Sequence, residues 1–550
     1  MREDFTAKAS LEPGLGAFLR SAGCRVRAGR LRIPSVTRLP AIFALVVGLA
    51  VAGCATPPQT LPRGEPGHAL APQAGGELGS VEERLRVRAG PDASGFRLLE
   101  SNEDGLRWRL ALIDSARHSL DLQYYVWWGD ESGNLLMKRV IDAADRGVRV
   151  RLLLDDLSTI LRDEGHPELR DGAAALVDAH PNIEIRLFNA WRARSLTGRV
   201  FEMFGRAERI NHRMHNKLFV ADNRVAVIGG RNIGNEYFGL SNEFNFRDLD
   251  VLGVGPVARQ ASAVFDRFWN SEWVMPVAAL GIAATHDDLA RVRTPLREQL
   301  GSAPSLARFP VDRQDWSDAL AALDRGLHIG ASRVHTDSPD ADAVNHHMPA
   351  AIRELLASAR REVLITNAYI IPGAHALQRT REQIGRGVEF RMLTNSLASH
   401  DVPAVNSHYK QWRRPLLEAG VDLYEMRSDA AVQSSLADTP PAKAEFMGLH
   451  VKAMVIDRER VFIGSMNLDP RSWDINSEMG VVVDSEGLAR ELAAAMERDM
   501  RPENAWHVVL GADGAVRWIS GDKALTTQPA RSLWQRIEDV IFMAFPRDLY

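Results

Sequence analysis

The chain has 550 residues, of which 45% are hydrophobic and 25% charged, and its formal net charge is −4. This composition is typical of a globular protein and excludes a disordered chain, a collagen-like fibre and a disulfide-stapled miniprotein. The two cysteines, Cys24 and Cys54, are too few for a cysteine-based zinc site. The acidic balance disfavours a generally basic nucleic-acid binder.

The N-terminal segment has the pattern of an export signal. Residues 39–55 carry no charge and end in small residues around Cys54, and five arginines lie in residues 25–38. A positive flank, a short apolar core and a small-residue exit favour a secretory signal over a membrane-spanning helix, which needs about 20 apolar residues. A plain N-terminal anchor is the alternative. We predict a signal peptide at 1–53 and a Pro/Gly-rich tether at 54–94.

The body of the chain repeats one succession of strands and helices. The pattern is two strands separated by a helix and followed by a third strand, and it occurs twice. The first strands are 115–128 and 358–371, the second strands are 147–156 and 387–396, and the third strands are 182–190 and 420–427. Strands that alternate with helices predict an α/β fold in which each sheet is largely buried.

This repeat predicts the domain organisation. We expect two α/β domains, at 95–310 and 311–510, followed by a C-terminal hairpin and an amphipathic helix at 511–550. Leu533, Trp534, Ile537, Ile541 and Phe545 fall near one face of that helix. We favour docking of this face against the protein body, and contact with a membrane surface is the alternative.

The repeat continues into a set of polar residues. His, Lys, Asp, Gly and Asn recur at offsets 0, 2, 7, 14 and 17 in the segments 213–232 and 448–467. The first set is His215, Lys217, Asp222, Gly229 and Asn232, and the second is His450, Lys452, Asp457, Gly464 and Asn467. One match is weak, but two matches at corresponding places of a duplicated unit indicate a shared chemical role.

These residue types suit a phosphodiester. His and Lys two residues apart on a strand point to the same face, and Lys and Asn donate hydrogen bonds to phosphate oxygens. Two histidines that face one phosphorus atom permit double displacement, in which one attacks and the other transfers protons. Asp248 and Glu478 precede apolar strands and are candidates to orient the imidazoles. The residues alone leave open which histidine attacks, and Asp222 and Asp457 also fit hairpin turns.

The duplicated H-x-K-x4-D motifs, each followed by G-S/G-x-N, resemble the HKD motifs of the phospholipase D superfamily. Segments such as LDLQYYVW, GGRNIGNEYF and TNSLASHDVPAV resemble its bacterial cardiolipin synthases, in particular those of the C type. The resemblance covers residues 95–550. It implies two pseudo-symmetric α/β/α domains that share one active site at their interface, so that a monomer suffices, with no cofactor and no metal.

The resemblance also implies roles for individual residues. His215 is the expected nucleophile and His450 the expected acid and base, while Lys217, Lys452, Asn232 and Asn467 hold the phosphate. Ser465 is expected to assist, whereas the first motif has Gly230 at the matching position. The catalytic set that we predict therefore contains both His–Lys pairs with Asp222, Asp457, Asp248 and Glu478.

The predicted activity is a phosphatidyltransferase that makes cardiolipin from two membrane phospholipids through a phosphohistidine. A phospholipase D-type hydrolase that releases phosphatidic acid and a phosphodiesterase or nuclease are the alternatives. Residues 51–54 resemble the lipobox of bacterial lipoproteins, which implies a lipid anchor on Cys54 and, with Ala55 after it, the periplasmic side of the outer membrane. A nucleic-acid partner is not expected, because the chain without its basic leader is more acidic still.

Two further features have structural and functional interpretations. Tyr124, Tyr125, Trp127 and Trp128 are expected to be buried aromatics of a strand, with an acyl-chain channel as the alternative. The loop at 395–401 follows a predicted strand, where ligand-binding loops often lie, and it is a candidate for acceptor selection.

Overall fold

The computed structural model describes residues 62–156, 167–194, 198–199, 202, 207–339 and 347–544. The predicted signal peptide, Cys54 and the first part of the predicted tether lie outside these residues. Of the helices described, none is both long and apolar enough to cross a bilayer.

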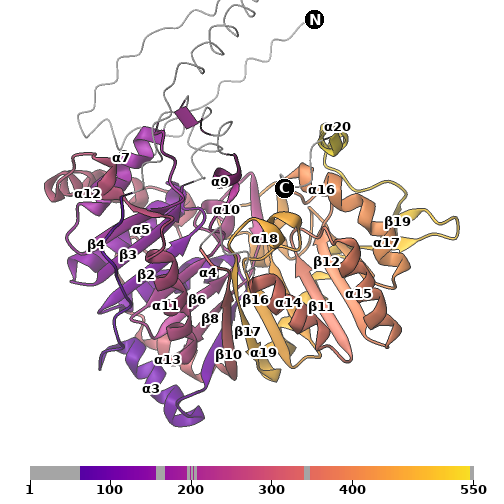
Figure 1. The fold of residues 1–550 in the computed structure, drawn as a ribbon, viewed down its shortest axis with the longest axis horizontal. Coiled ribbons are helices and arrows are strands. Elements are labelled where there is room, and N and C mark those ends of the chain that lie inside the picture. Colours follow the sequence, from indigo (N-terminus) through magenta and orange to yellow (C-terminus); the bar gives the residue numbers. More distant parts are fainter. Residues whose placement is uncertain are drawn as a thin grey trace, which may run out of the picture.

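One sheet of eighteen strands runs through the described residues. Its first half contains, in spatial order, β9 (Val274–Pro276), β4 (Ile183–Phe188), β3 (Arg149–Asp155), β2 (Ser119–Tyr124), β5 (Leu218–Ala221), β6 (Val225–Gly229), β8 (Asp250–Val254) and β1 (Ser94–Leu99). Its second half contains β10 (His328–Thr336), β17 (Met479–Asp484), β16 (Arg460–Gly464), β15 (Lys452–Ile456), β11 (Glu362–Asn367), β12 (Glu389–Asn395), β13 (Asp422–Met426), β18 (Ala505–Leu510), β19 (Val516–Ser520) and β20 (Lys523–Leu525). Figure 1 shows the two halves side by side.

The two halves have the same strand order. In the first half the parallel strands β2, β3 and β4 adjoin the hairpin β5–β6, and in the second half β11, β12 and β13 adjoin the hairpin β15–β16. Strand β10 joins the halves, because residues 328–330 pair with β1 and residues 331–336 with β17. The α/β fold class is thus confirmed. The domain boundaries at 310 and 510 stay predictions, since the sheet continues across the junction.

Helices cover the sheet in two outer layers and one central layer. The first outer core includes α3 (Glu77–Ala89), α4 (Asn102–Ser115), α5 (Glu131–Asp145), α7 (Pro167–Asp178), α12 (His286–Gly301) and α13 (Ser317–Arg325). The second includes α14 (His347–Ala357), α15 (Ala374–Gly385), α16 (Pro403–Tyr409) and α17 (Arg413–Glu418). The central core joins residues of both halves through α11 (Pro256–Trp269) and α19 (Glu486–Asp499). The halves therefore share buried apolar surface.

Local sequence explains the central helices. Helix α11 begins with Pro256 at its first position, and its buried Val257, Ala261, Val264 and Phe268 recur every three or four residues. Helix α19 buries a similar stripe on the same shared core. Because each helix packs on both halves, the two strand ends that carry the histidines are held at a fixed separation.

The prediction of a tether up to residue 94 was wrong in its described part. Helix α3 buries Leu78, Val81 and Leu85, and before it the backbone of Gly67 exchanges hydrogen bonds with the side chain of Asn270. The count of Pro and Gly concealed the helical spacing of these three apolar residues. From residue 62 onward the segment is part of the first half.

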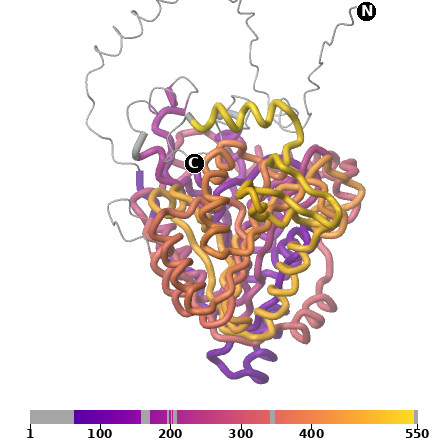
Figure 2. Tube along the Cα trace, turned by 90° about the vertical axis from the view of Figure 1, so that its right-hand side faces the viewer, coloured from indigo at the N-terminus to yellow at the C-terminus, as the bar shows by residue number. Residues whose placement is uncertain are grey.

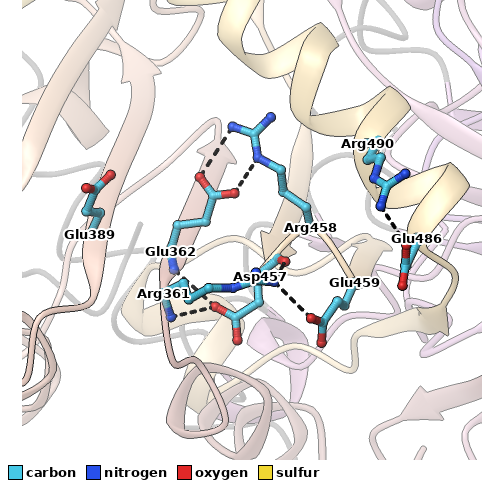
Figure 3. Close-up of a pocket in the computed structure, with 8 residues that line it drawn as sticks. All are labelled: Arg361, Glu362, Glu389, Asp457, Arg458, Glu459, Glu486 and Arg490. Carbon is cyan, nitrogen blue, oxygen red and sulfur yellow. Dashed lines mark hydrogen bonds and ion pairs between the residues drawn. The ribbon is translucent and has the colours of Figure 1, made fainter.

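Asp222 and Asp457 form the hairpin turns and lie far from the histidines. Both have positive φ, as do the residues after them, which is the geometry of a two-residue type I′ turn. The Asp457 carboxylate accepts hydrogen bonds from the backbone N–H groups of Arg360, Arg361 and Glu362. Figure 3 shows Asp457 beside Arg361 and Glu362. Seven residues of extended chain separate it from His450, which is roughly 20 Å. The prediction that these two aspartates are catalytic was wrong.

Asp222 makes the matching contacts in the first half. Its carboxylate accepts from the backbone N–H groups of Arg117, His118 and Ser119 at 2.7–3.2 Å. Each aspartate thus binds the start of the strand that neighbours its hairpin, β2 in the first half and β11 in the second, and both of these strands run antiparallel to the hairpin strand beside them. The motif aspartates are therefore conformational residues, which explains why they recur at the same offset from each histidine.

We expect Asp457→Ala to lower the free energy of unfolding by about 2–4 kcal/mol, because it leaves buried N–H groups without an acceptor. Asp457→Asn keeps one acceptor oxygen and tolerates the positive φ, so it should cost less than half as much. Urea unfolding of the full chain measures both variants. Unchanged stability of Asp457→Ala together with a lost enzymatic rate would contradict the structural role.

Candidate active site

The structure brings both predicted histidines to one site between the two halves. His215 precedes β5 and His450 precedes β15, and both are at least nine-tenths buried. The charges of Lys452 and His450, both from the second motif, act to lower the pKa of the His215 imidazole in the first motif. Groups from the two motifs therefore lie close together. The duplicated sequence motif therefore forms one cluster.

Each histidine is held by a carboxylate from the other half. The Nδ1 atom of His215 lies 2.9 Å from both carboxylate oxygens of Glu478, and the Nδ1 atom of His450 lies 2.6 Å from Oδ2 of Asp248. Asp248 and Glu478 are fully buried. Both were predicted to orient a histidine, and the structure adds that the two pairs cross between the halves. No hydrogen bond to the Nε2 atom of either histidine is formed within the described residues.

Backbone pairing explains the crossed arrangement. The N–H of His215 donates to the carbonyl of Ser477, the residue before Glu478, at 2.8 Å. The N–H of His450 donates to the carbonyl of Arg247, the residue before Asp248, also at 2.8 Å. A short parallel sheet of β7 (Phe244–Arg247) and β14 (Phe446–Leu449) extends this second contact. The main chain thus places each carboxylate beside the histidine of the opposite motif.

The two motif lysines are buried cations. The Nζ atoms of Lys217 and Lys452 donate to the carbonyl of their own motif histidine at 2.6 Å, and no described carboxylate lies within ion-pair distance of either one. Burial lowers the pKa of Lys217 well below its ordinary value and that of Lys452 to about 8, although nearby carboxylates act in the opposite direction. A phosphate placed between them would supply the missing counter-charge.

The two histidine–carboxylate pairs differ in electrostatics. Burial raises the pKa of Glu478 to about 7, although Lys217 and hydrogen bonds from Ser465 and Ser472 act against it. Burial also acts to raise the pKa of Asp248, but the contact with His450 and the charge of Lys452 bring it below the ordinary value. Burial and the lysines lower the pKa of both histidines, and that of His215 falls well below its ordinary range.

Ser465 supports a carboxylate of the site. Its hydroxyl donates to Oε2 of Glu478, and the residue is fully buried. The hydroxyl thus helps to hold Glu478, and the predicted role of Ser465 toward a phosphate stays a prediction. At the matching position, a Cβ atom on Gly230 would lie 2.3 Å from Oδ1 of Asp248, so the first motif has glycine because the aspartate occupies this space.

The two motif asparagines are both buried at the site. Asn232 accepts a hydrogen bond from the N–H of Val126 and donates to the hydroxyl of Tyr237. The Oδ1 atom of Asn467 has no hydrogen-bond partner among the described residues. Their roles toward a phosphate stay predictions.

Asp155 and Tyr369 were missed by the sequence interpretation, whereas Asn395 and Asp401 lie in the loop that it named for acceptor selection. Asp155 accepts the N–H of Met214, and Asn395 accepts the N–H of Leu449, so both fix the backbone just before a motif histidine. They occupy the same position of the repeated second strand, 147–156 and 387–396, and that duplication is a signal that could have found both. In the predicted acceptor loop, Asp401 bonds the hydroxyl of Tyr369 at 2.9 Å, and the Tyr369 ring lies 5.9 Å from Nζ of Lys452.

The four aromatics of the first repeat have three different environments. Tyr124 is buried and bonds Arg109, as expected of a core aromatic. Tyr125 packs edge-on against His215 at 5.0 Å. Trp127 and Trp128 line a mainly apolar cavity of about 160 Å³ between β3, α5, α7 and α12.

In the described part of the chain, no group of three or more His, Cys, Asp and Glu side chains is placed to hold a metal ion.

Comparison with known proteins identifies similar chains. The family described as "Cardiolipin synthase, PLD-like domain" matches residues 110–269 and 352–500. Cardiolipin synthase C of Escherichia coli (strain K12) is 34% identical over 455 residues, covering 81% of this chain and 94% of that protein. An uncharacterized protein of Helicobacter pylori (strain ATCC 700392 / 26695) is 33% identical over 431 residues, covering 77% of this chain and 82% of that protein. A crystal structure of phosphatidylserine synthase from Haemophilus influenzae Rd KW20 aligns with 77% of this chain and 91% of its own, at 14% identity and a TM-score of 0.49.

The unequal carboxylates predict opposite pH dependences of stability. The pKa of Glu478 is about 7 in the folded protein against an ordinary 4.5, so its contribution is complete below pH 4.5 and is lost as the pH rises to 7. The stability of Glu478→Gln relative to the wild type should therefore improve by up to about 3 kcal/mol across this window.

Asp248→Asn is the matched control, because its stability relative to the wild type should depend on pH in the opposite direction. The folded-state pKa of Asp248 is below 3.8, so its stabilising contribution is present at neutral pH and is lost in acid. The cost of Asp248→Asn should thus shrink as the pH falls below about 4. Urea unfolding at pH 2.5 to 8 measures the stability of both variants, and a parallel dependence on pH for the two would contradict the opposite pKa shifts.

Proposed function

Because the chain belongs to the cardiolipin synthase family with phospholipase D-like domains, we propose that it is a phosphatidyltransferase that joins two phospholipids into cardiolipin. The observation that carries the proposal is the crossed pair of histidines, whose Nδ1 atoms are bound to carboxylates beside two buried lysines without a carboxylate counter-ion within reach. This arrangement suits the transfer of a phosphatidyl group from one alcohol to another.

In the first step, Nε2 of His215 attacks the phosphorus of the donor phospholipid. The bond from phosphorus to the headgroup oxygen breaks, and protonated His450 donates a proton to the leaving alcohol. The product is a phosphatidyl group bonded to His215. The strongly lowered pKa of His215 supports this assignment, since a nucleophilic imidazole must be neutral. Burial also lowers the pKa of His450, but the Asp248 carboxylate bonded to it acts in the opposite direction and so supports its role as the proton donor.

In the second step, the acceptor is a hydroxyl group of a second phospholipid. Neutral His450 removes the proton of this hydroxyl while its oxygen attacks phosphorus, and the bond to His215 breaks. Cardiolipin leaves, and His450 is protonated again, ready for the next donor. Lys217 and Lys452 stabilise the negative charge of the phosphoryl oxygens throughout, with Asn232 and Asn467 as further donors.

Capture of the same intermediate by water would release phosphatidic acid. The burial of both histidines supports transfer over hydrolysis, because a dry site disfavours water as the acceptor. One chain carries both motifs, so a monomer suffices for a complete site.

We further propose, on the basis of the lipobox-like residues 51–54, that Cys54 is lipidated and tethers the enzyme to the cell envelope, on the periplasmic side of the outer membrane.

The products of the reaction test this function. We expect the purified protein, with phosphatidylglycerol, phosphatidylethanolamine and a chelator, to form cardiolipin and a free headgroup alcohol, measured by mass spectrometry. The chelator should not change the rate, since no step uses a metal. Phosphatidic acid as the sole lipid product would identify a hydrolase, and activity on DNA alone would identify a nuclease.

The roles of the two histidines predict different trapped species. His215→Ala and His450→Ala should each lower the rate by about 10²-fold or more. With phosphatidylglycerol, His450→Ala should retain a phosphatidyl adduct on His215, which peptide mass spectrometry detects, while His215→Ala should show none. An adduct on His450 in the His215→Ala variant would reverse the assignment.

A further inference from the structure

The C-terminal helix exposes its apolar side. Helix α20 (Leu533–Ile541) and the turn after it carry six large apolar side chains on the surface, and these six make up what we call the apolar face. Leu533 is 74% exposed, and Trp534 is 62% exposed. The members of the face are Leu533, Trp534, Ile537, Val540, Ile541 and Met543. They account for six of the eleven exposed large hydrophobic residues in the described part of the chain. The expectation that Leu533, Trp534, Ile537 and Ile541 dock on the protein body was wrong, and Phe545 of the same predicted face lies outside the described residues.

The polar side of α20 is the side that is buried. The Asp539 carboxylate accepts hydrogen bonds from Lys410 at 2.7 Å and from Asn406 at 2.6 Å, and Gln535 donates to the carbonyl of Leu397. Gln535 and Asp539 are almost fully buried. Turning the apolar face inward would leave these polar groups unpaired, so the outward orientation is built into the fold.

The segment beneath α20 borders the active site. Gln535 binds the loop at 395–401, and Asn406 lies on α16, which follows that loop. In the same loop, Asp401 bonds Tyr369, whose ring lies over Lys452. Val402, between the loop and α16, is also exposed. The helix that carries the apolar face therefore packs on the loop at 395–401 and α16, the segment that borders the active site on the side of the second motif.

The placement of α20 in the molecule agrees with this proximity. Figures 1 and 2 show α20 at the upper edge of the molecule, above α16, with α3 at the opposite end. Contacts of α16 with α20 and with the turn after it fix the helix at this edge. One edge of the protein thus combines an exposed apolar face with the segment that borders the catalytic cluster.

We propose that α20 and the following turn form a docking surface that inserts into the interfacial region of a phospholipid bilayer. The inference rests on the proposed function, because its substrates carry two acyl chains and stay in a membrane while the site binds their phosphates. A contiguous exposed apolar face with a tryptophan is typical of an interfacial helix. Docking holds the loop at 395–401 at the lipid headgroups, where an acceptor hydroxyl can enter.

The charges of α20 specify the mode of binding. Arg536 is the single basic residue of the helix, with Glu538 and Asp539 as its acids, so it has no cationic side for anionic lipids. Insertion of apolar side chains must therefore provide the affinity. Binding is expected to be insensitive to salt and to the fraction of phosphatidylglycerol, in contrast to helices that bind through clusters of lysine and arginine.

Hydrogen exchange tests docking independently of activity. The full-length protein is compared with and without vesicles of phosphatidylethanolamine and phosphatidylglycerol, at 50 and 500 mM salt. We expect slower exchange in residues 533–544 when vesicles are present, at both salt concentrations, and no change in α3. Unchanged exchange of 533–544 would overturn the proposal. Slow exchange that depends on protein concentration without vesicles would overturn it too, because it would indicate a contact between copies of the chain.

A kinetic comparison tests the link to the substrate. The triple variant Trp534→Ser, Ile537→Ser, Val540→Ser should raise the apparent KM for long-chain phosphatidylglycerol in vesicles by about tenfold or more. Its kcat/KM for monomeric dihexanoyl phosphatidylglycerol should stay within about twofold of the wild type, because only the membrane step is weakened. Val87→Ser is the matched control, since Val87 is 78% exposed on the distant α3 and should change neither value.

The two experiments separate the docking proposal from the proposed function. Equal vesicle KM values for the triple variant and the wild type would overturn docking, as would an equal loss on both substrates. A wild-type protein that turns over neither substrate while residues 533–544 are protected by vesicles would instead overturn the transferase function and retain the docking surface.

Discussion

The structure depends on two buried imidazoles that are each held by a carboxylate from the opposite half. A histidine at this depth needs an acceptor on Nδ1 to fix its orientation, and here Glu478 serves His215 while Asp248 serves His450. Neither half contains a complete pair. The shared core around α11 and α19 and the common strand β10 therefore do more than stabilise the protein, because they hold the two half-sites in register.

The crossing also makes the two copies of the motif chemically unequal. A glutamate that is fully buried and a shorter aspartate that contacts its histidine at 2.6 Å have pKa shifts of opposite sign. Duplication alone would produce two equivalent histidines, and a double displacement requires one neutral and one protonated group. The pKa of His215 falls well below its ordinary value, whereas the bonded Asp248 opposes the lowering of the His450 pKa by burial, so the two histidines differ in the direction that this mechanism needs.

Much of this arrangement was predictable from the sequence. The repeated offsets identified both His–Lys pairs, and the alternation of strands and helices identified the α/β fold, because both depend on local spacing. The crossing was not predictable, since it depends on contacts of Met214 with Ser477 and of β14 with β7, more than 200 residues apart. Asp222 and Asp457 were misassigned for the same reason. Their carboxylates are directed to backbone partners that spacing does not reveal.

The contact between Gly230 and Asp248 restricts how the two halves can diverge. A side chain at 230 would collide with the carboxylate that orients His450, while the second half has Ser465 hydrogen-bonded to a longer glutamate. Replacing Gly230 by serine, or Ser465 by glycine, would make one copy of the motif resemble the other. Either replacement is unfavourable unless the neighbouring carboxylate, Asp248 or Glu478, changes as well. The residue at 230 is thus coupled to Asp248 as Ser465 is coupled to Glu478, so we expect that making the two copies alike requires changes at both members of a couple.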